Sequence, residues 1–509
     1  MLTRTVSKHP KRPEHEPSAR LTLVLGLLVV GGALVILRPW SIQRVREIPM
    51  PEDQLREKVL SLRLGDEHPL TPLEHKKAAL GRALFRDQSL SGDGKTSCAS
   101  CHIPEKFFSD GSTYPVAGPL AGTDRAAQLR HTPALGNGRL LQWANWDGSR
   151  DSLGAQALHM LEDPTIMGSS RLHVVRRVVA SHREAYEEAF GSLPAILKHL
   201  DFPPHGLPAI EEVKLPIEIS SYGLATLSGK GLLLDILTES QKKRLAPATE
   251  LSRRVLDFPT PDGTWVKAYK DLDDEVKEAI DHAFIRVGQA FAAYQRHIVS
   301  APSKFDRFAE RLVAGDTVER AMEATSFSET ELTGLKLFVG PGGCLHCHSG
   351  PGFSDQKFHN IGLPSKDGAV PMGRAVGALL ALGDPFNCFS HAFPDVNFPT
   401  NDDTDRCPTL SSIDVSDVRQ VGAFKTPSLR NVAMTAPYMH DGRFPNLEKV
   451  LEFYSHFEGG PATGERDPVL TPLRLSPEEV EALSAYLGAL TSPLLDLGVA
   501  SNLSHLDGD

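Results

Sequence analysis

The sequence predicts a mainly α-helical protein with two similar halves, long loops and one hydrophobic helix near the N-terminus. The two halves are indicated by the pentapeptide Cys-x-x-Cys-His, which occurs twice and is followed each time by similar short motifs in the same order. Pro and Gly are frequent and long runs of β-branched residues are few, which favours helices joined by loops over sheets. The hydrophobic helix is predicted by an apolar, uncharged stretch over residues 21–37.

The N-terminus predicts a membrane anchor. Residues 1–20 form a basic tail that should stay in the cytoplasm, and residues 21–37 are then a single-pass transmembrane anchor of the inner membrane, with the rest of the chain in the periplasm. The alternative is a cleaved signal peptide, but the stretch ends at Leu37 without the small-x-small pattern of a cleavage site. A net charge of −10 over 509 residues argues against nucleic acid as a partner, since binding phosphates requires a basic face.

The chain is longer than a single core usually supports, so several domains are expected. Residues 38–74 are interpreted as a linker that leads into a short helix. The first domain spans 75–300, with an insertion at about 185–270, and the second spans 301–495, with an insertion at about 365–420.

An amphipathic helix is predicted over residues 273–300. Apolar residues recur there at helical spacing, so one face should pack into the core of the first domain. The residues on this face are Val276, Ile280, Phe284, Val287, Phe291, Tyr294 and Ile298.

Each pentapeptide carries the residues that attach a c-type haem. Two thiols separated by two residues add to the vinyl groups of one haem, and the histidine that follows ligates the iron. A zinc site would require a second Cys or His pair at short spacing, and a thioredoxin-type pair would lie in a βαβ unit; neither context is present. We therefore expect two covalent haem c cofactors. Their attachment residues are Cys98, Cys101 and His102 in the first half and Cys344, Cys347 and His348 in the second.

Three motifs follow each attachment site in the same order. The first set is Phe-Ser-Asp at 108–110, Thr-Pro at 132–133 and Trp-Asp-Gly at 146–148; the second is Phe-Ser-Asp at 353–355, Thr-Pro at 426–427 and His-Asp-Gly at 440–442. This agreement predicts an internal duplication.

Two cysteines remain, Cys388 and Cys407, and both lie inside the second insertion. In an oxidising compartment such a pair most often forms a disulfide, which we expect here. The alternative is two buried free thiols.

With these motifs the chain resembles the bacterial di-haem cytochrome c peroxidase superfamily over about residues 75–490. The resemblance rests on both attachment motifs, the paired Phe-Ser-Asp and Thr-Pro motifs, Trp-Asp-Gly and the segment PYMHDGRFPNLEKVLEFY, residues 437–454. The family includes MauG-type enzymes, which oxidise tryptophans on a partner protein. The resemblance implies two cytochrome c-like domains, a peroxide-reacting haem at His102, an electron-transfer haem at His348, and Trp146 between the two haems.

The resemblance also implies that Tyr454 is the outer axial ligand of the second haem. In the family this ligand lies about a dozen residues beyond His-Asp-Gly, as Met in peroxidases and Tyr in MauG-like enzymes, and that position is Tyr454. A tyrosinate is a hard anionic ligand that favours ferric and higher oxidation states, whereas a Met thioether favours ferrous iron. The alternative is an ordinary helix tyrosine with a satisfied hydroxyl.

Met160 is a second candidate iron ligand, because the duplication aligns it with Tyr454. If Met160 ligated iron, the first haem would be closed to peroxide and suited to electron transfer. The alternative is a flexible apolar side chain that lines the pocket. No His occurs between His102 and His131, so without Met160 the first haem would be open or bound to water, as in MauG-like members.

The pocket on the outer side of the first haem departs from the family pattern. The family places a Gln, a Pro and a Glu after Trp-Asp-Gly, and the Glu helps to move peroxide protons. Here the Pro position holds Met160 and the Glu position holds Ile166, which cannot exchange protons. The catalytic candidates are Trp146, Gln156 and Glu162, with Asp163 and His159 as alternatives to Glu162.

Calcium is a further cofactor that the resemblance suggests. Thr435 and Pro437 match positions that offer oxygen ligands to an inter-haem Ca²⁺. The third family ligand, an Asn, falls near His131. Imidazole is a poor ligand for this hard cation, so Asn137 or a water would have to substitute for the site to form.

The function expected from the resemblance is that of a periplasm-facing di-haem c-type oxidoreductase. Hydrogen peroxide would react at the N-terminal haem, and a partner protein or an electron donor, such as a small cytochrome or a cupredoxin, would be oxidised through the C-terminal haem. The alternatives are a simple cytochrome c peroxidase that detoxifies peroxide and a non-catalytic di-haem electron-transfer cytochrome, which Met160 ligation would favour.

Overall fold

The computed structural model describes residues 48–64, 71–118, 121–122, 130–163, 165–198, 210–214, 257–261, 269, 271–366, 371–388 and 407–496. The basic tail at 1–20 and the anchor predicted at 21–37 lie outside these residues, as does most of the first insertion. None of the helices in the described ranges has the length and apolar character needed to cross a membrane.

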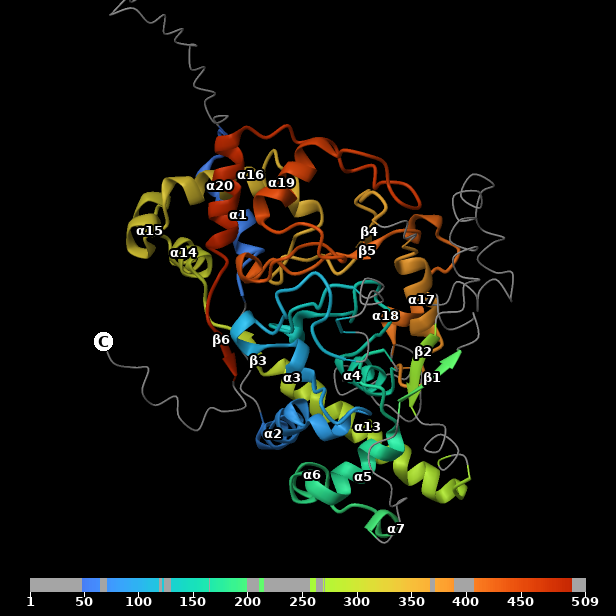
Figure 1. Ribbon diagram of the computed structural model, residues 1–509. Helices are drawn as coiled ribbons and strands as arrows, with labels where there is room; N and C mark the ends of the chain where they lie inside the picture. The colour runs from blue at the N-terminus through green and yellow to red at the C-terminus, as the bar shows by residue number, and fades with distance from the viewer. Residues whose placement is uncertain are drawn as a thin grey trace, which may run out of the picture. The chain divides into compact units, whose positions relative to one another are not determined.

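The described chain is mainly helical, which confirms the predicted class (Figure 1). The strands are short and pair only in twos: β1 with β2, β3 with β6, and β4 with β5, all antiparallel. The helices are α1 Glu52–Leu60, α2 Pro72–Arg86, α3 Cys98–Cys101, α4 Leu153–Glu162, α5 Arg171–Ser181, α6 Arg183–Phe190, α7 Ala195–Lys198, α13 Asp274–Arg296, α14 Lys304–Val313, α15 Val318–Thr325, α16 Glu329–Val339, α17 Arg374–Leu382, α18 Pro408–Ser411, α19 Leu447–His456 and α20 Pro477–Gly488. The strands are β1 Ile210–Lys214, β2 Asp257–Pro261, β3 Ile298–Ser300, β4 Phe358–His359, β5 Phe424–Lys425 and β6 Leu494–Asp496.

The first half is built on the packing of α2 against α13, which run side by side in Figure 1. A capping box between Thr71 and Glu74 begins α2. The two helices approach closely at Gly81, where a Cβ atom would lie 2.0 Å from the Ala290 carbonyl oxygen, so only glycine fits. The predicted apolar face of α13 is buried, although the helix ends at Arg296 and Ile298 lies in β3, because the chain there turns to pair with β6.

The second half repeats this arrangement with α16 and α20. A capping box between Ser328 and Glu331 begins α16. Gly334 takes the place of the first half's glycine: a Cβ atom there would lie 1.9 Å from the Ala482 carbonyl oxygen. The same close helix contact therefore occurs once in each half, as an internal duplication predicts.

The ends of the two halves meet in the β3–β6 pair. Beside it, the amides of Asn137 and Asn431 both donate to the Oγ atom of Ser300, at 2.7 Å each. Each asparagine also accepts one backbone N–H through its Oδ1, from Ser300 at 2.9 Å and from Ser492 at 2.8 Å respectively. This pattern places equivalent residues of the two halves around one point.

The segment interpreted as a linker, residues 38–74, contains α1, whose Leu55 and Val59 are buried in the core of the second half together with Leu62. Arg430 ties this segment down, since its Nη2 donates to the Leu62 carbonyl. The described part of the segment is thus a structural element of the second half.

The second insertion is attached to the first half. A disulfide joins Cys388 and Cys407, with Cα atoms 5.8 Å apart. The backbone N–H of Cys388 donates to the Asp151 carboxylate at 2.8 Å. From α17 in the same insertion, Arg374 donates to the Gly148 carbonyl at 2.6 Å. The insertion therefore holds the loop of the Trp-Asp-Gly motif.

Candidate functional site

Both attachment motifs open into one cavity of about 1530 Å³. Its walls come from the two halves: α3 and α4 of the first, and α19 and the loop after α16 of the second. All six predicted attachment residues line it, namely Cys98, Cys101, His102, Cys344, Cys347 and His348. The structure thus brings together residues that are far apart in the chain.

The two motif histidines are oriented as metal ligands. His102 Nδ1 lies 2.9 Å from the Phe108 carbonyl and His348 Nδ1 lies 2.9 Å from the Phe353 carbonyl. A carbonyl can only accept, so each Nδ1 carries the proton and each Nε2 keeps its lone pair. Burial lowers the pKa of both rings, which favours the neutral form that binds metal. Such an Nδ1–H to carbonyl bond is the usual support of a ligating histidine.

The motif thiols lie in apolar surroundings. Burial is the main cause that raises the pKa of Cys98 and of Cys344 to about 12, so neither thiol ionises readily. Among the described residues no group of three or more His, Cys, Asp and Glu side chains could hold a metal ion. These surroundings fit covalent attachment to a large apolar ring better than a zinc–thiolate site.

The two motif loops are braced in the same way. Ser109 Oγ donates to the Thr132 carbonyl at 3.1 Å, and Ser354 Oγ donates to the Thr426 carbonyl at 2.7 Å. Thr132 also donates its hydroxyl to Asp110 at 2.8 Å. The Phe-Ser-Asp and Thr-Pro motifs therefore work as a pair beneath each attachment histidine.

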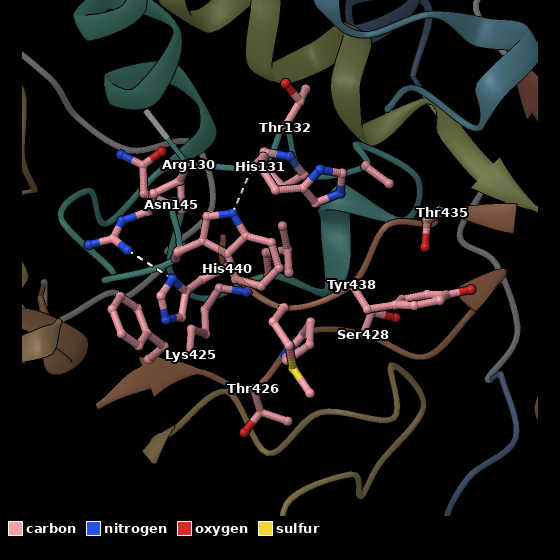
Figure 2. A pocket seen from close by; sticks show the side chains of 18 of the residues that line it. Arg130, His131, Thr132, Asn145, Lys425, Thr426, Ser428, Thr435, Tyr438 and His440 are labelled. Carbon is pink, nitrogen blue, oxygen red and sulfur yellow. Dashed lines mark hydrogen bonds between the residues drawn. The ribbon is translucent and has the colours of Figure 1, made fainter. Parts of the chain in front are cut away.

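A small group of residues, which we call the junction, joins the two halves inside the cavity (Figure 2). It consists of Arg130, His131, Trp146, Lys425 and His440. The backbone N–H of His131 donates to the His440 carbonyl at 3.1 Å, and that of Lys425 donates to the Trp146 carbonyl at 2.8 Å. Trp146 Nε1 donates to the His131 carbonyl at 2.8 Å. Trp146 is thus held by both halves and lines the cavity that the two attachment motifs share.

Tyr454 lies on α19 with its side chain in the cavity. Its ring contacts Phe453 and Phe457 edge-on. Burial, and then the nearby Cys347 and Cys344, raise the pKa of its hydroxyl. The hydroxyl of Tyr454 therefore belongs to the surroundings of the second attachment motif.

Met160 and Gln156 lie one turn apart on α4, and both line the cavity. Helices α4 and α19 begin alike, since Ser152 caps the first through Ala155 N–H and Asn446 caps the second. The two helices have the same length, and Met160 and Tyr454 hold the same position in them. Gln156 Oε1 is buried without a hydrogen-bond partner among the described residues.

Glu162 lines the cavity but is engaged by Arg171. Two bonds, Nε to Oε1 at 2.9 Å and Nη2 to Oε2 at 2.8 Å, make the pair bidentate, and Arg171 also reaches Asp281 at 3.1 Å. Asp163 is the better placed carboxyl group: it lines the cavity, and among the described residues its ion-pair contact is with His159 at 3.8 Å, whose pKa burial lowers to about 3. Burial raises the pKa of Asp163.

The residues proposed for calcium are arranged around an imidazole. Thr435 and Pro437 line the cavity, but the Thr435 hydroxyl donates to the Val432 carbonyl at 3.2 Å. The His131 ring lies against the Thr435 carbonyl and bonds through Nδ1 to the Ser112 carbonyl at 2.8 Å. Asn137 bonds to Ser300. These side chains do not form an oxygen cage for a hard cation.

Sequence reasoning missed the buried basic residues of the cavity. Arg150 pairs with Asp384 at 2.9 Å, and Arg430 pairs with Asp306 at 2.8 Å. Lys425, which is half-buried, has no such partner in the part of the chain that the structure describes. Their positions next to the motifs could have indicated that these residues reach the cavity. His131 and Lys425 each precede a Thr-Pro motif, and Arg150 follows Trp-Asp-Gly.

The duplicated halves and the cavity lined by two attachment motifs fit a protein that binds two haem c groups, and the comparisons point to the same class. Residues 75–210 match the family described as di-haem cytochrome c peroxidase. The chain is 27% identical to cytochrome-c peroxidase IdrP1 of Pseudomonas sp. (strain SCT), with 83% of each protein covered. It is 28% identical to methylamine utilization protein MauG of Methylorubrum extorquens, with 83% of this chain and 79% of that protein covered.

Two solved structures are also similar. One is a MauG-like protein associated with microbial copper homeostasis, with a TM-score of 0.48, 22% identity, and 89% of this chain and 96% of that chain covered. The other is the diheme peroxidase BthA of Burkholderia thailandensis, with a TM-score of 0.49, 18% identity, and 84% and 89% covered. By its family match and its relatives, this chain is similar to the di-haem cytochrome c peroxidases. It is a di-haem oxidoreductase, and the family implies two haem c cofactors.

Proposed function

We propose that the protein reduces hydrogen peroxide at the haem held by His102 and takes the electrons from a partner protein or protein electron donor through the haem held by His348. The carrying observation is that both histidines, each with its Nδ1 at a carbonyl oxygen, line one cavity together with Trp146 and Tyr454. Reducing hydrogen peroxide to two water molecules takes two electrons and two protons. The haem irons, when bound, supply the redox chemistry.

The first contribution of the protein to this reaction is to fix the positions of the side chains around the haems. The Nδ1–H bonds of His102 and His348 fix the two rings, and the bonds from both halves fix Trp146 as the aromatic group on the path between them. Tyr454 is assigned as the outer ligand of the second haem, a MauG-like feature that favours oxidation of a partner protein over simple detoxification. We assign to Gln156, whose Oε1 has no partner, a hydrogen bond to the bound oxidant.

Asp163 is assigned the proton transfer that Ile166 cannot perform. Cleavage of the O–O bond requires a group that accepts one proton and returns it to the leaving oxygen. Glu162 is tied to Arg171 by a bidentate pair, whereas Asp163 accepts hydrogen bonds from the Thr165 hydroxyl at 2.6 Å and the Thr165 backbone N–H at 2.8 Å and has no arginine or lysine in an ion pair among the described residues. A raised pKa brings a carboxyl group closer to the working range of an acid–base catalyst.

Two further parts of the proposal concern the surroundings of the haems. The junction is held by the His131 imidazole in place of a calcium ion, because His131 reaches Ser112 and faces Thr435. Residues 21–37 anchor the protein in the inner membrane with the haem domains in the periplasm, as the basic N-terminal tail suggests. Membrane fractionation and an alkaline phosphatase fusion after residue 44 test the second point.

The experiment is a peroxide titration of the purified ferric protein, followed by optical and electron-paramagnetic spectra. We expect a high-spin ferric signal from the first haem that disappears with about one equivalent of peroxide. In the Tyr454→Met variant the spectrum of the second haem should change and its potential should rise. A protein inert to peroxide would reject the function, and unchanged spectra in the variant would remove Tyr454 from the iron.

A second candidate function is electron transfer without catalysis. It is favoured by Met160, which holds on α4 the position that Tyr454 holds on α19. If Met160 ligates iron, both haems are low-spin and peroxide does not react. Replacement of Met160 by Leu then opens the first haem and creates a high-spin signal, whereas a pocket-lining Met160 leaves the spectrum unchanged.

A further inference from the structure

The cavity is lined by the cations Arg130, Arg150, Lys425 and Arg430 and by the acids Asp147, Glu162 and Asp163. Arg150 and Arg430 line it, and each is neutralised by a buried aspartate in an ion pair of 2.9 and 2.8 Å. Glu162, which also lines the cavity, is neutralised from outside by Arg171. Two cations of the junction, Arg130 and Lys425, lie outside these pairs.

Lys425 is a half-buried lysine whose Nζ has no carboxylate partner among the described residues. It lies in β5, where its backbone N–H holds the Trp146 carbonyl, and its side chain lines the cavity. Among the described residues no group forms a hydrogen bond or an ion pair with its Nζ, and burial alone lowers its pKa to about 8. An isolated buried ammonium group is costly unless an anion accompanies it.

Arg130 is the second cation of the junction, beside Lys425 in the residues that line the cavity (Figure 2). Its guanidinium lies 4.5 Å from the centre of the Phe424 ring, and that ring stacks on His440 at 3.8 Å. Arg130 Nη1 donates to His440 Nδ1 at 3.0 Å. Since arginine cannot accept, the His440 ring carries its proton on Nε2, which is left as a further donor. No carboxylate among the described residues pairs with Arg130.

Each haem bears two propionate carboxylates, so two haems attached at the motifs would bring four carboxylates to this cavity, which both motifs and the junction line. We propose that Arg130 and Lys425 bind haem propionates at the junction, with His440 as a supporting donor, and that their positive charge sets the reduction potentials of the haems. This proposal depends on the proposed function in one respect only, namely that two haems are attached to the protein.

The electrostatic consequence has a definite sign. A cation near a haem disfavours the ferric state, which carries one more positive charge than the ferrous state. Replacement of Lys425 by Met keeps the length of the side chain and removes the charge, so the midpoint potential of at least one haem should fall. The Lys425→Arg variant should keep the potentials close to those of the wild type, because it keeps the charge.

The test is spectroelectrochemical titration of the purified holoprotein, with haem content measured in each variant. Lys357→Met is the matched control, because Lys357 is an exposed lysine next to β4, which pairs with β5. We expect a negative shift in Lys425→Met, a shift of the same sign in Arg130→Gln, and none in Lys357→Met. Loss of a haem in Lys425→Met that is restored in Lys425→Arg would also support the proposal.

Two results would overturn it: unchanged potentials in both Lys425→Met and Arg130→Gln with both haems attached, or an equal shift in Lys357→Met. Either result leaves the reaction with peroxide to be judged by its own titration. Conversely, a protein inert to peroxide would still show the shift, so failure of the proposed function and failure of this inference are distinguishable.

Discussion

The two halves of the protein share a backbone plan and differ in the side chains that fill equivalent places. Gly81 and Gly334, Asn137 and Asn431, and the paired loops below the attachment histidines are common to both. Several other positions that line the cavity hold different residues, such as Met160 and Tyr454. The comparison teaches that contacts of the main chain and of small polar groups define the haem-holding frame, while a few exchanged side chains give each half its own chemistry.

The buried ion pairs show this most clearly. Arg430 of the second half corresponds to Gly136 in the first, and Arg150 of the first half corresponds to Phe444 in the second. The two arginines form buried ion pairs at different places: Arg430 with Asp306, which secures α14 within the second half, and Arg150 with Asp384, which attaches the second insertion to the first half.

The largest effect is expected on the rate of reaction with peroxide, when Asp163 in the cavity wall of the first half is replaced. Asp163→Asn should slow the reaction with peroxide about 10²–10⁴-fold, the usual contribution of a positioned acid–base group. Stopped-flow absorbance of the ferric protein measures this rate. Glu162→Gln is the control and should react nearly as fast as the wild type, since Glu162 is bonded to Arg171. If Glu162→Gln were the slow variant, the assignment would be reversed.

Breaking the ion pair of the second half should be the next largest effect. Arg430 and Asp306 are 1% and 3% exposed, so Arg430→Met leaves a buried carboxylate without its partner. We expect a loss of about 3–5 kcal/mol in the free energy of unfolding, measured by urea titration of the holoprotein. Arg419→Met is the control, since Arg419 pairs with Asp417 at the surface; a similar loss there would contradict the role of burial.

The helix caps provide a smaller comparison. Ser152 and Asn446 cap α4 and α19, the helices that carry Met160 and Tyr454. Replacement of either cap by Ala should cost about 1 kcal/mol of stability. Ser152→Ala should alter the spectrum of the first haem only, and Asn446→Ala that of the second only. Equal spectral changes at both haems would show that the two helices do not act on separate sites.

The smallest effect is expected from calcium. Dialysis of the holoprotein against a chelator should leave its spectra and melting temperature unchanged, because His131 holds the place between Ser112 and Thr435. The variant His131→Asn supplies an oxygen instead and should gain stability when Ca²⁺ is added. A loss of activity in the wild type that Ca²⁺ restores would contradict this view.

Much of the frame could be predicted from the sequence, because it depends on patterns that repeat. The attachment motifs, the order of the loop motifs and the apolar face of α13 all have fixed spacing. The role of the second insertion could not be predicted, since Arg374 and Cys388 reach the first half across more than two hundred residues of chain. Likewise, Glu162 and Asp163 are neighbours in the sequence, and only the position of Arg171 distinguishes them.

The shared serine hydroxyl has a consequence for the origin of the molecule. In a dimer of two identical subunits related by a twofold axis, two equivalent serine hydroxyls would compete for the one place between the two asparagine amides. In the fused chain Ser300 fills this position and receives both asparagine amides, while Ser492, its counterpart, keeps only its backbone bond, and its Oγ is buried without a partner among the described residues. In a single polypeptide the two serines are different residues, so one of them can occupy the place between the asparagines. Fusion of the halves in one gene makes that assignment permanent, and it leaves the other residue free to change.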